Sequence, residues 1–77
     1  MKHDRQQRYL DLADRHIAAA ERRIDRQRQI VAELRRSGQD AALALELLTT
    51  MQAVLDGMQR HRDYIEAQSL KSRSRLN

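Results

Sequence analysis

The sequence predicts an all-α fold: an antiparallel two-helix hairpin, coiled-coil-like, that dimerises into a four-helix bundle. Hydrophobic residues recur with helical spacing in both halves of the 77-residue chain. The chain has no proline and only two glycines, Gly38 and Gly57, so there is little to interrupt a helix more than once. Aromatic residues are limited to Tyr9 and Tyr64, which leaves an aliphatic core.

The first helix is predicted over residues 4–36. Its hydrophobic seam repeats at intervals of three and four residues, as in a heptad pattern, with one polar exception. The seam consists of Leu10, Ala13, Ile17, Ala20, Ile24, Gln27, Val31 and Leu34. Tyr9, His16 and Ile30 widen it on one flank, while charged residues such as Asp14 and Glu21 follow the other flank.

The stretch RRSGQD predicts a turn over residues 37–40. Arg35 and Arg36 place positive charge at the helix C-terminus, where the helix dipole favours it. Gly38 can adopt the left-handed conformation that ends a helix, and Asp40 can cap the helix that follows. A connection this short is typical of antiparallel neighbours.

The second helix is predicted over residues 41–67, with a hydrophobic face three columns wide. The central column consists of Ala44, Met51, Met58 and Ile65, which recur every seven residues. The flanking columns are Leu47, Val54 and His61 on one side, and Leu48, Leu55 and Arg62 on the other. A single partner helix covers a narrower seam, so this face requires contacts from two directions. Residues 1–67 are therefore expected to form the hairpin, and residues 68–77 a flexible basic tail.

A two-helix hairpin leaves part of each hydrophobic face in water, so we expect a homodimer with two-fold symmetry. A different, unknown protein is the alternative partner. The expected core and interface residues are Leu10, Ile17, Ile24, Gln27, Val31, Leu34, Leu47, Leu48, Met51, Val54, Leu55, Met58, His61 and Ile65. The function expected from this pattern is a non-enzymatic module that self-associates and acts through protein contacts, as an adaptor or regulator.

Three polar residues lie on the hydrophobic faces or their flanks. Gln27 lies roughly opposite Met51, where it could fix the register by meeting its own symmetry mate or could turn its amide outward. His16 and His61 are expected at the same height of the hairpin. They are weak candidates for metal ligands, because neither has a second ligand one turn away on its own helix. We favour a packing role, in which both histidines are partly buried and hydrogen-bonded.

The formal net charge of +4 allows an acidic partner. The alternative function is a small basic hairpin dimer that binds RNA or DNA through Arg15, Arg22, Arg23 and Arg26. We do not favour it, because Glu21 and Asp25 interrupt the arginines, and no aromatic residue is placed for base stacking. The charge is also divided: residues 1–36 carry ten Lys/Arg and six Asp/Glu, whereas residues 40–66 carry two arginines and five acids.

Other functional classes find little support. The chain has no cysteine nucleophile and no glycine-rich phosphate loop, so we expect neither catalysis nor a cofactor. The longest unbroken apolar stretch, residues 41–45, is far too short for a membrane span. The absence of cysteine fits a reducing compartment, and we expect a cytoplasmic protein that does not associate with membranes.

Residues 16–65 resemble a group of short bacterial helical-hairpin proteins of uncharacterised activity. The matching residues are His16, Ile17, Gln27, Gly38, Leu47, Leu48, His61, Arg62, Asp63 and Ile65. The resemblance implies a helical hairpin and supplies no function. It also implies that His16 and His61 occur together, which suits a paired structural role.

Overall fold

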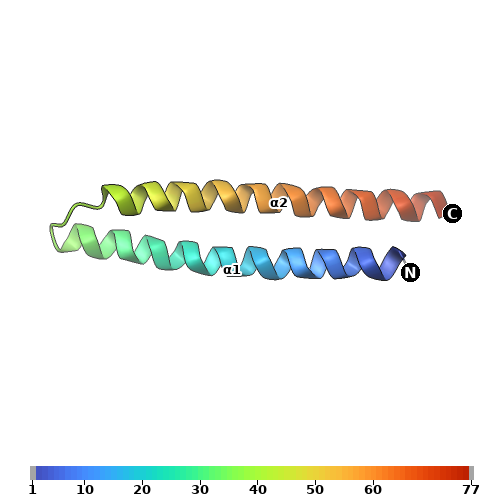
Figure 1. The fold of residues 1–77 in the computed structure, drawn as a ribbon, viewed down its shortest axis with the longest axis horizontal. Coiled ribbons are helices and arrows are strands. Elements are labelled where there is room, and N and C mark those ends of the chain that lie inside the picture. The colour runs from blue at the N-terminus through green and yellow to red at the C-terminus, as the bar shows by residue number, and fades with distance from the viewer. Residues whose placement is uncertain (1, 77) are drawn as a thin grey trace.

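The computed structural model is an antiparallel hairpin of two helices (Figure 1). It describes the backbone of residues 2–76 and the side chains of residues 5–72. α1 spans Lys2–Arg36 and α2 spans Ala42–Leu76, with 35 residues in each helix. The molecule is a rod measuring 62 × 15 × 12 Å, so the helices form one layer with a single line of contact between them. The predicted all-α hairpin is confirmed.

A glycine-dependent motif ends α1, as the sequence predicts. Gly38 has a φ of 71°, in the left-handed region that glycine adopts without strain. The N–H of Gln39 donates to the carbonyl of Leu34 at 2.8 Å, and the N–H of Gly38 donates to that of Arg35 at 3.2 Å. These two bonds form a Schellman motif, which provides hydrogen-bond donors for carbonyls that have no partner at the end of a helix.

The beginning of α2 is capped by an aspartate. A side-chain oxygen of Asp40 accepts a hydrogen bond from the N–H of Ala42 at 2.9 Å. The first carbonyl to join the helical pattern is that of Ala41, which accepts from the N–H of Leu45. The helix thus begins at Ala42, one residue later than predicted.

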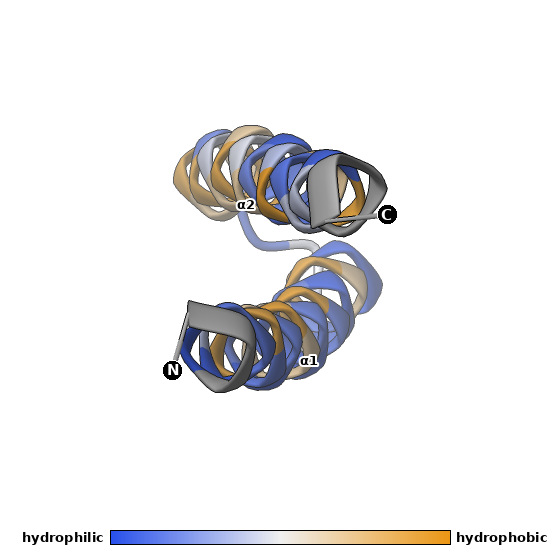
Figure 2. Cartoon of the chain, turned by 90° about the vertical axis from the view of Figure 1, so that its right-hand side faces the viewer, coloured by the Kyte–Doolittle hydropathy of each residue, from blue (hydrophilic) through white to orange (hydrophobic). Residues whose placement is uncertain are grey.

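The core lies along the predicted seam and is thin. Ile24, Val31 and Ala41 are the buried hydrophobic residues among those described, and Gln27 is buried with them. The remaining seam residues of α1, such as Leu10 and Leu34, are only half-buried. Figure 2 shows hydrophobic segments of α1 on the side turned toward α2, whereas those at the beginning of α2 spread around more of the helix. One neighbouring helix therefore covers only part of the hydrophobic surface.

The expected end of the second helix near residue 67 is wrong, because α2 continues to Leu76. No glycine or proline follows Gly57, so nothing in the local sequence stops the helix. α1 also reaches back to Lys2, which gives the last turns of α2 a neighbour. The hydroxyl of Ser69 donates to the side-chain oxygen of Gln6 at 3.1 Å, so the contact between the helices includes this segment. The side chains of Arg73 and Arg75 lie outside the described residues.

Neither helix, over the residues that the structure describes, contains a stretch that is both long and apolar enough to cross a bilayer.

Candidate interaction surface

The two faces of the hairpin differ in chemical character. We call one of them the apolar face. It consists of two columns of residues on each helix. The columns of α1 are Tyr9, His16, Arg23 and Ile30, and next to them Leu12, Ala19, Arg26 and Glu33. The columns of α2 are Leu47, Val54 and His61, and next to them Leu43, Thr50, Gly57 and Tyr64. Each column repeats every seven residues, so its members share one side of their helix.

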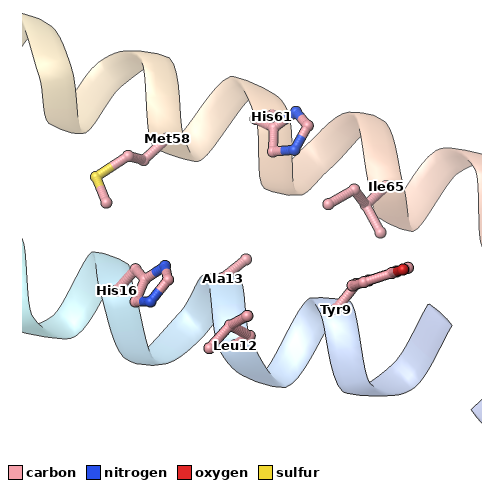
Figure 3. Close-up of a pocket in the computed structure, with 7 residues that line it drawn as sticks. All are labelled: Tyr9, Leu12, Ala13, His16, Met58, His61 and Ile65. Atoms are coloured by element: carbon pink, nitrogen blue, oxygen red, sulfur yellow. The ribbon is translucent and has the colours of Figure 1, made fainter. Parts of the chain in front are cut away.

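A hollow of about 430 Å³ lies between the helices on the apolar face. Figure 3 shows its lining side chains, with Tyr9, Leu12 and His16 from α1, and Met58, His61 and Ile65 from α2. A second hollow continues from His16 and Met58 toward Arg23, Thr50 and Val54. Because the two hollows share His16 and Met58, they form one groove along the apolar face.

Large hydrophobic side chains of the apolar face are in contact with solvent, and Leu12 and Val54 among them line the groove. Val54 is 57% exposed, Leu47 is 51% exposed and Leu12 is 49% exposed. Tyr64 and Leu43 are still more accessible. Several exposed hydrophobic side chains on one side of a small protein are typical of an interaction surface.

Charged residues line the opposite face of the hairpin. Arg62 donates from Nε to a carboxylate oxygen of Asp14 at 2.8 Å and pairs with Glu66 on its own helix. The hydrogen bond and charge of Asp14, followed by the charge of Glu66, raise the pKa of the Arg62 guanidinium. Two hollows on this face are bordered by acidic and basic side chains, including Asp56. Arg62, which occupies a hydrophobic column of the sequence, therefore joins the two helices through charge.

Gln27 adopts neither of the two arrangements considered for it. Its side chain is 8% exposed, and its Nε2 donates to the carbonyl oxygen of Ala44 at 3.0 Å. The amide therefore points between the helices of one chain, not outward. A buried amide needs a partner, and the neighbouring backbone is the nearest available acceptor. This bond ties α1 to the beginning of α2.

His16 and His61 lie at one height and border the same hollow, as the sequence predicts (Figure 3). Both histidines are exposed, and neither takes part in a hydrogen bond among the side chains that the structure describes. The prediction that both are partly buried and hydrogen-bonded is therefore wrong for the single chain. Within the described residues, no three His, Cys, Asp or Glu side chains gather in a way that could hold a metal ion. The single chain thus brings two imidazoles together, on the apolar face.

The four arginines of the alternative function are all exposed on α1. Arg23 borders the groove on the apolar face. Asp25, which interrupts the arginines, pairs with Arg28 at 3.2 Å, and none of the four takes part in an ion pair observed within residues 5–72. Arg15, Arg22, Arg23 and Arg26 are thus available to an acidic partner.

No family model, curated protein or solved structure matches this chain in comparisons of its sequence and fold. The resemblance of residues 16–65 to short bacterial hairpin proteins stays a prediction.

The structure adds residues to the surface that the sequence predicted. Leu48 and Leu55 are half-buried, so only the column that contains Leu47 and Val54 stays open. Leu12, Leu43 and Tyr64 belong to the apolar face but not to the predicted interface. Their signal in the sequence is a second repeat of three and four residues in α2, which runs through Leu43, Leu47, Thr50, Val54, Gly57, His61 and Tyr64.

Proposed function

We propose that this protein is a non-enzymatic module in which two copies pack through their apolar faces to form a four-helix bundle. The observation that carries the proposal is the size of the exposed surface. Folded monomers of this mass expose about 4,900 Å², whereas the 9.1 kDa hairpin exposes 6445 Å². The excess of about 1,500 Å² is larger than the roughly 800 Å² that each partner buries in a standard interface.

The thin core supports the same proposal. Few side chains are buried between α1 and α2, and a chain of this size gains little stability from one line of contacts. A second hairpin placed on the apolar face would cover Leu12, Leu47 and Val54 without disturbing the contacts within either chain. Each fully buried side chain of this type contributes about 1.5–3 kcal/mol.

In such a bundle the charged faces, with Asp14, Arg62 and Glu66, remain outside. We infer that these faces contact other proteins, so that the module serves as an adaptor or regulator. The chain lacks cysteine, which fits a reducing compartment, and with the predicted resemblance to short bacterial proteins we propose a bacterial cytoplasm as the place of this role.

The apolar face is tested by a substitution at its centre. Val54→Glu puts a carboxylate where the second copy would pack, and burying an unpaired charge is costly. We expect the dimer mass in light scattering for the native chain and half that mass for Val54→Glu, with helical circular dichroism retained. Gln59→Glu is the matched control, because Gln59 is exposed on another side of α2. Equal masses for Val54→Glu and the native chain would overturn the proposed face.

Binding of nucleic acid is the second candidate function. The observation in its favour is the exposure of Arg15, Arg22, Arg23 and Arg26 without an observed ion pair. Arg15 and Arg22 are one heptad apart, so in a dimer they would border the interface and form a basic surface on each α1.

A further inference from the structure

We propose that the two hairpins pack with their turns at the same end of the bundle, so that α1 of each copy lies on α2 of the other. This inference rests on the proposed self-association and specifies its geometry. The two-fold axis would run along the length of the rod. The alternative is an axis across the rod, which places the turns at opposite ends and packs each helix on its own counterpart.

The register within the hairpin defines which residues share a height. Asp14 contacts Arg62, and Gln6 contacts Ser69, so residues whose numbers add up to about 76 lie level with one another. Gln27 departs from this sum, because its side chain reaches the carbonyl of Ala44, which lies nearer the turn. An axis along the rod keeps these heights, because rotation about the long axis moves nothing along it. Level residues of α1 and the partner's α2 then face each other across the interface.

This arrangement brings like side chains together. Leu12 faces the partner's Tyr64, and Ile30 faces the partner's Leu47, so four exposed hydrophobic residues per copy are covered. His16 faces the partner's His61 in the same way, which makes the groove part of the interface. Hydrophobic residues of the two apolar faces thus meet at Leu12 and at Ile30, toward the two ends of the interface.

The small residues are also matched. Ala19 lies level with Gly57, so in this arrangement it faces the partner's Gly57 and allows the helices to approach closely. A side-chain carbon added at Gly57 would find only the tip of Arg60, at 3.8 Å, so the hairpin itself does not require glycine there. Glycine within a helix is unfavourable, and close approach of another backbone is a physical reason to retain it.

The alternative axis produces mismatched contacts. The middle of α1 is Ala19, and an axis that crosses the rod there lays Arg26 on the partner's Leu12 and brings Arg23 level with the partner's Arg15, which borders the apolar face. The exposed arginines of the two copies would then approach one another. With the axis along the rod, the same arginines are level with Thr50, Val54 and His61 of the partner's α2, none of which is an arginine or a lysine.

The overall charge of the two segments favours the same choice. Residues 1–36 have a formal charge of +4 and residues 40–66 one of −3, from ten Lys/Arg with six acids and from two arginines with five acids. With the axis along the rod, the acidic residues 40–66 lie beside the basic α1 segments of both copies, whereas Lys71, Arg73 and Arg75 at the end of α2 lie beyond this acidic part. With the axis across the rod, basic segments would lie on basic segments.

The test uses the absence of cysteine, which allows one spin label to be attached at a chosen site. Gln39→Cys places the label in the exposed turn, away from the apolar face. Neighbouring helices in a bundle are about 10 Å apart, so turns at the same end put the two labels within about 30 Å. Turns at opposite ends separate them by nearly the 62 Å length of the rod. Pulsed electron–electron double resonance distinguishes these distances.

Gln59→Cys is the matched control, because it lies at mid-helix and gives a short distance in either arrangement. We expect short distances for both labels. A short distance at Gln59→Cys with a long one at Gln39→Cys would overturn the arrangement and leave self-association intact. The absence of any intermolecular distance from both labels would instead overturn the self-association on which the arrangement rests.

Discussion

Gln27 lies in the seam between the helices and donates a hydrogen bond from its amide to the carbonyl oxygen of Ala44. It is a polar residue at a position where the heptad pattern otherwise has hydrophobic residues. A single buried amide of this kind fixes the register of two helices at a cost in stability. The bond to α2 therefore sets the alignment of the hairpin next to its turn.

Gln27→Leu is expected to raise the free energy of unfolding by about 1 kcal/mol. Leucine suits the buried position, and the carbonyl of Ala44 keeps its partner within the helix, so no acceptor is left unsatisfied. Chemical denaturation at a fixed protein concentration measures the change. Gln29→Leu, at an exposed site of the same helix, is the control. A clear loss of stability in Gln27→Leu would show that the amide stabilises the fold instead of specifying it.

Gly38→Ala is expected to destabilise the hairpin by about 1 kcal/mol or somewhat more. The cost comes from the backbone alone, because Gly38 has a φ of 71° and a side-chain carbon added there would meet no atom within 4 Å. Thermal unfolding measures it, and Gln39→Ala in the same turn serves as the control. An unchanged melting temperature would mean that the turn does not hold the left-handed conformation.

Arg62→Gln is expected to lower the melting temperature, because Asp14 loses the ion pair that joins it to α2. The pKa of Arg62 is raised in the folded state, so the guanidinium is charged at neutral and moderately alkaline pH, and its contribution is lost on the alkaline side only at pH values above the ordinary pKa of arginine. The difference in melting temperature between the variant and the native chain should therefore stay constant between about pH 7 and pH 10. Added salt should reduce that difference, because the pair is partly exposed. A difference that vanished within this pH range would contradict the ion pair.

A test of nucleic-acid binding separates the two candidate functions. If the arginines bind a phosphate backbone, low salt should allow the native chain to shift bulk RNA or DNA in a gel, and Arg22→Ala with Arg26→Ala should abolish the shift. Arg35→Ala with Arg36→Ala, at the end of α1, keeps the same net charge as the first pair and is the matched control. Under the favoured function, we expect no shift by any of the three proteins.

The sequence was sufficient to predict the hairpin, because each determining feature is local. Gly38 with Asp40 specifies the turn, and the regular spacing from Leu10 to Leu34 specifies the inward side of α1. The end of α2 was mispredicted because its last turns lack a hydrophobic repeat. In the structure α1 lies beside the beginning of this segment, where Ser69 contacts Gln6.

The interaction surface was predicted only in part. The sequence indicates three hydrophobic columns on α2 but cannot say which flank the neighbouring helix covers. That choice depends on the rotation of the helices about their axes, which buries Leu55 partly and leaves Val54 open. The bond of Gln27 to a backbone carbonyl was missed for a related reason, because an acceptor on the facing helix is defined only by the packing.

The mass of the native chain in solution tests the central claim most directly. Sedimentation equilibrium at micromolar concentration should give about twice the 9.1 kDa of one chain, together with cooperative thermal unfolding whose midpoint rises with protein concentration. A folded species of 9.1 kDa with a cooperative transition independent of concentration would contradict self-association through the apolar face.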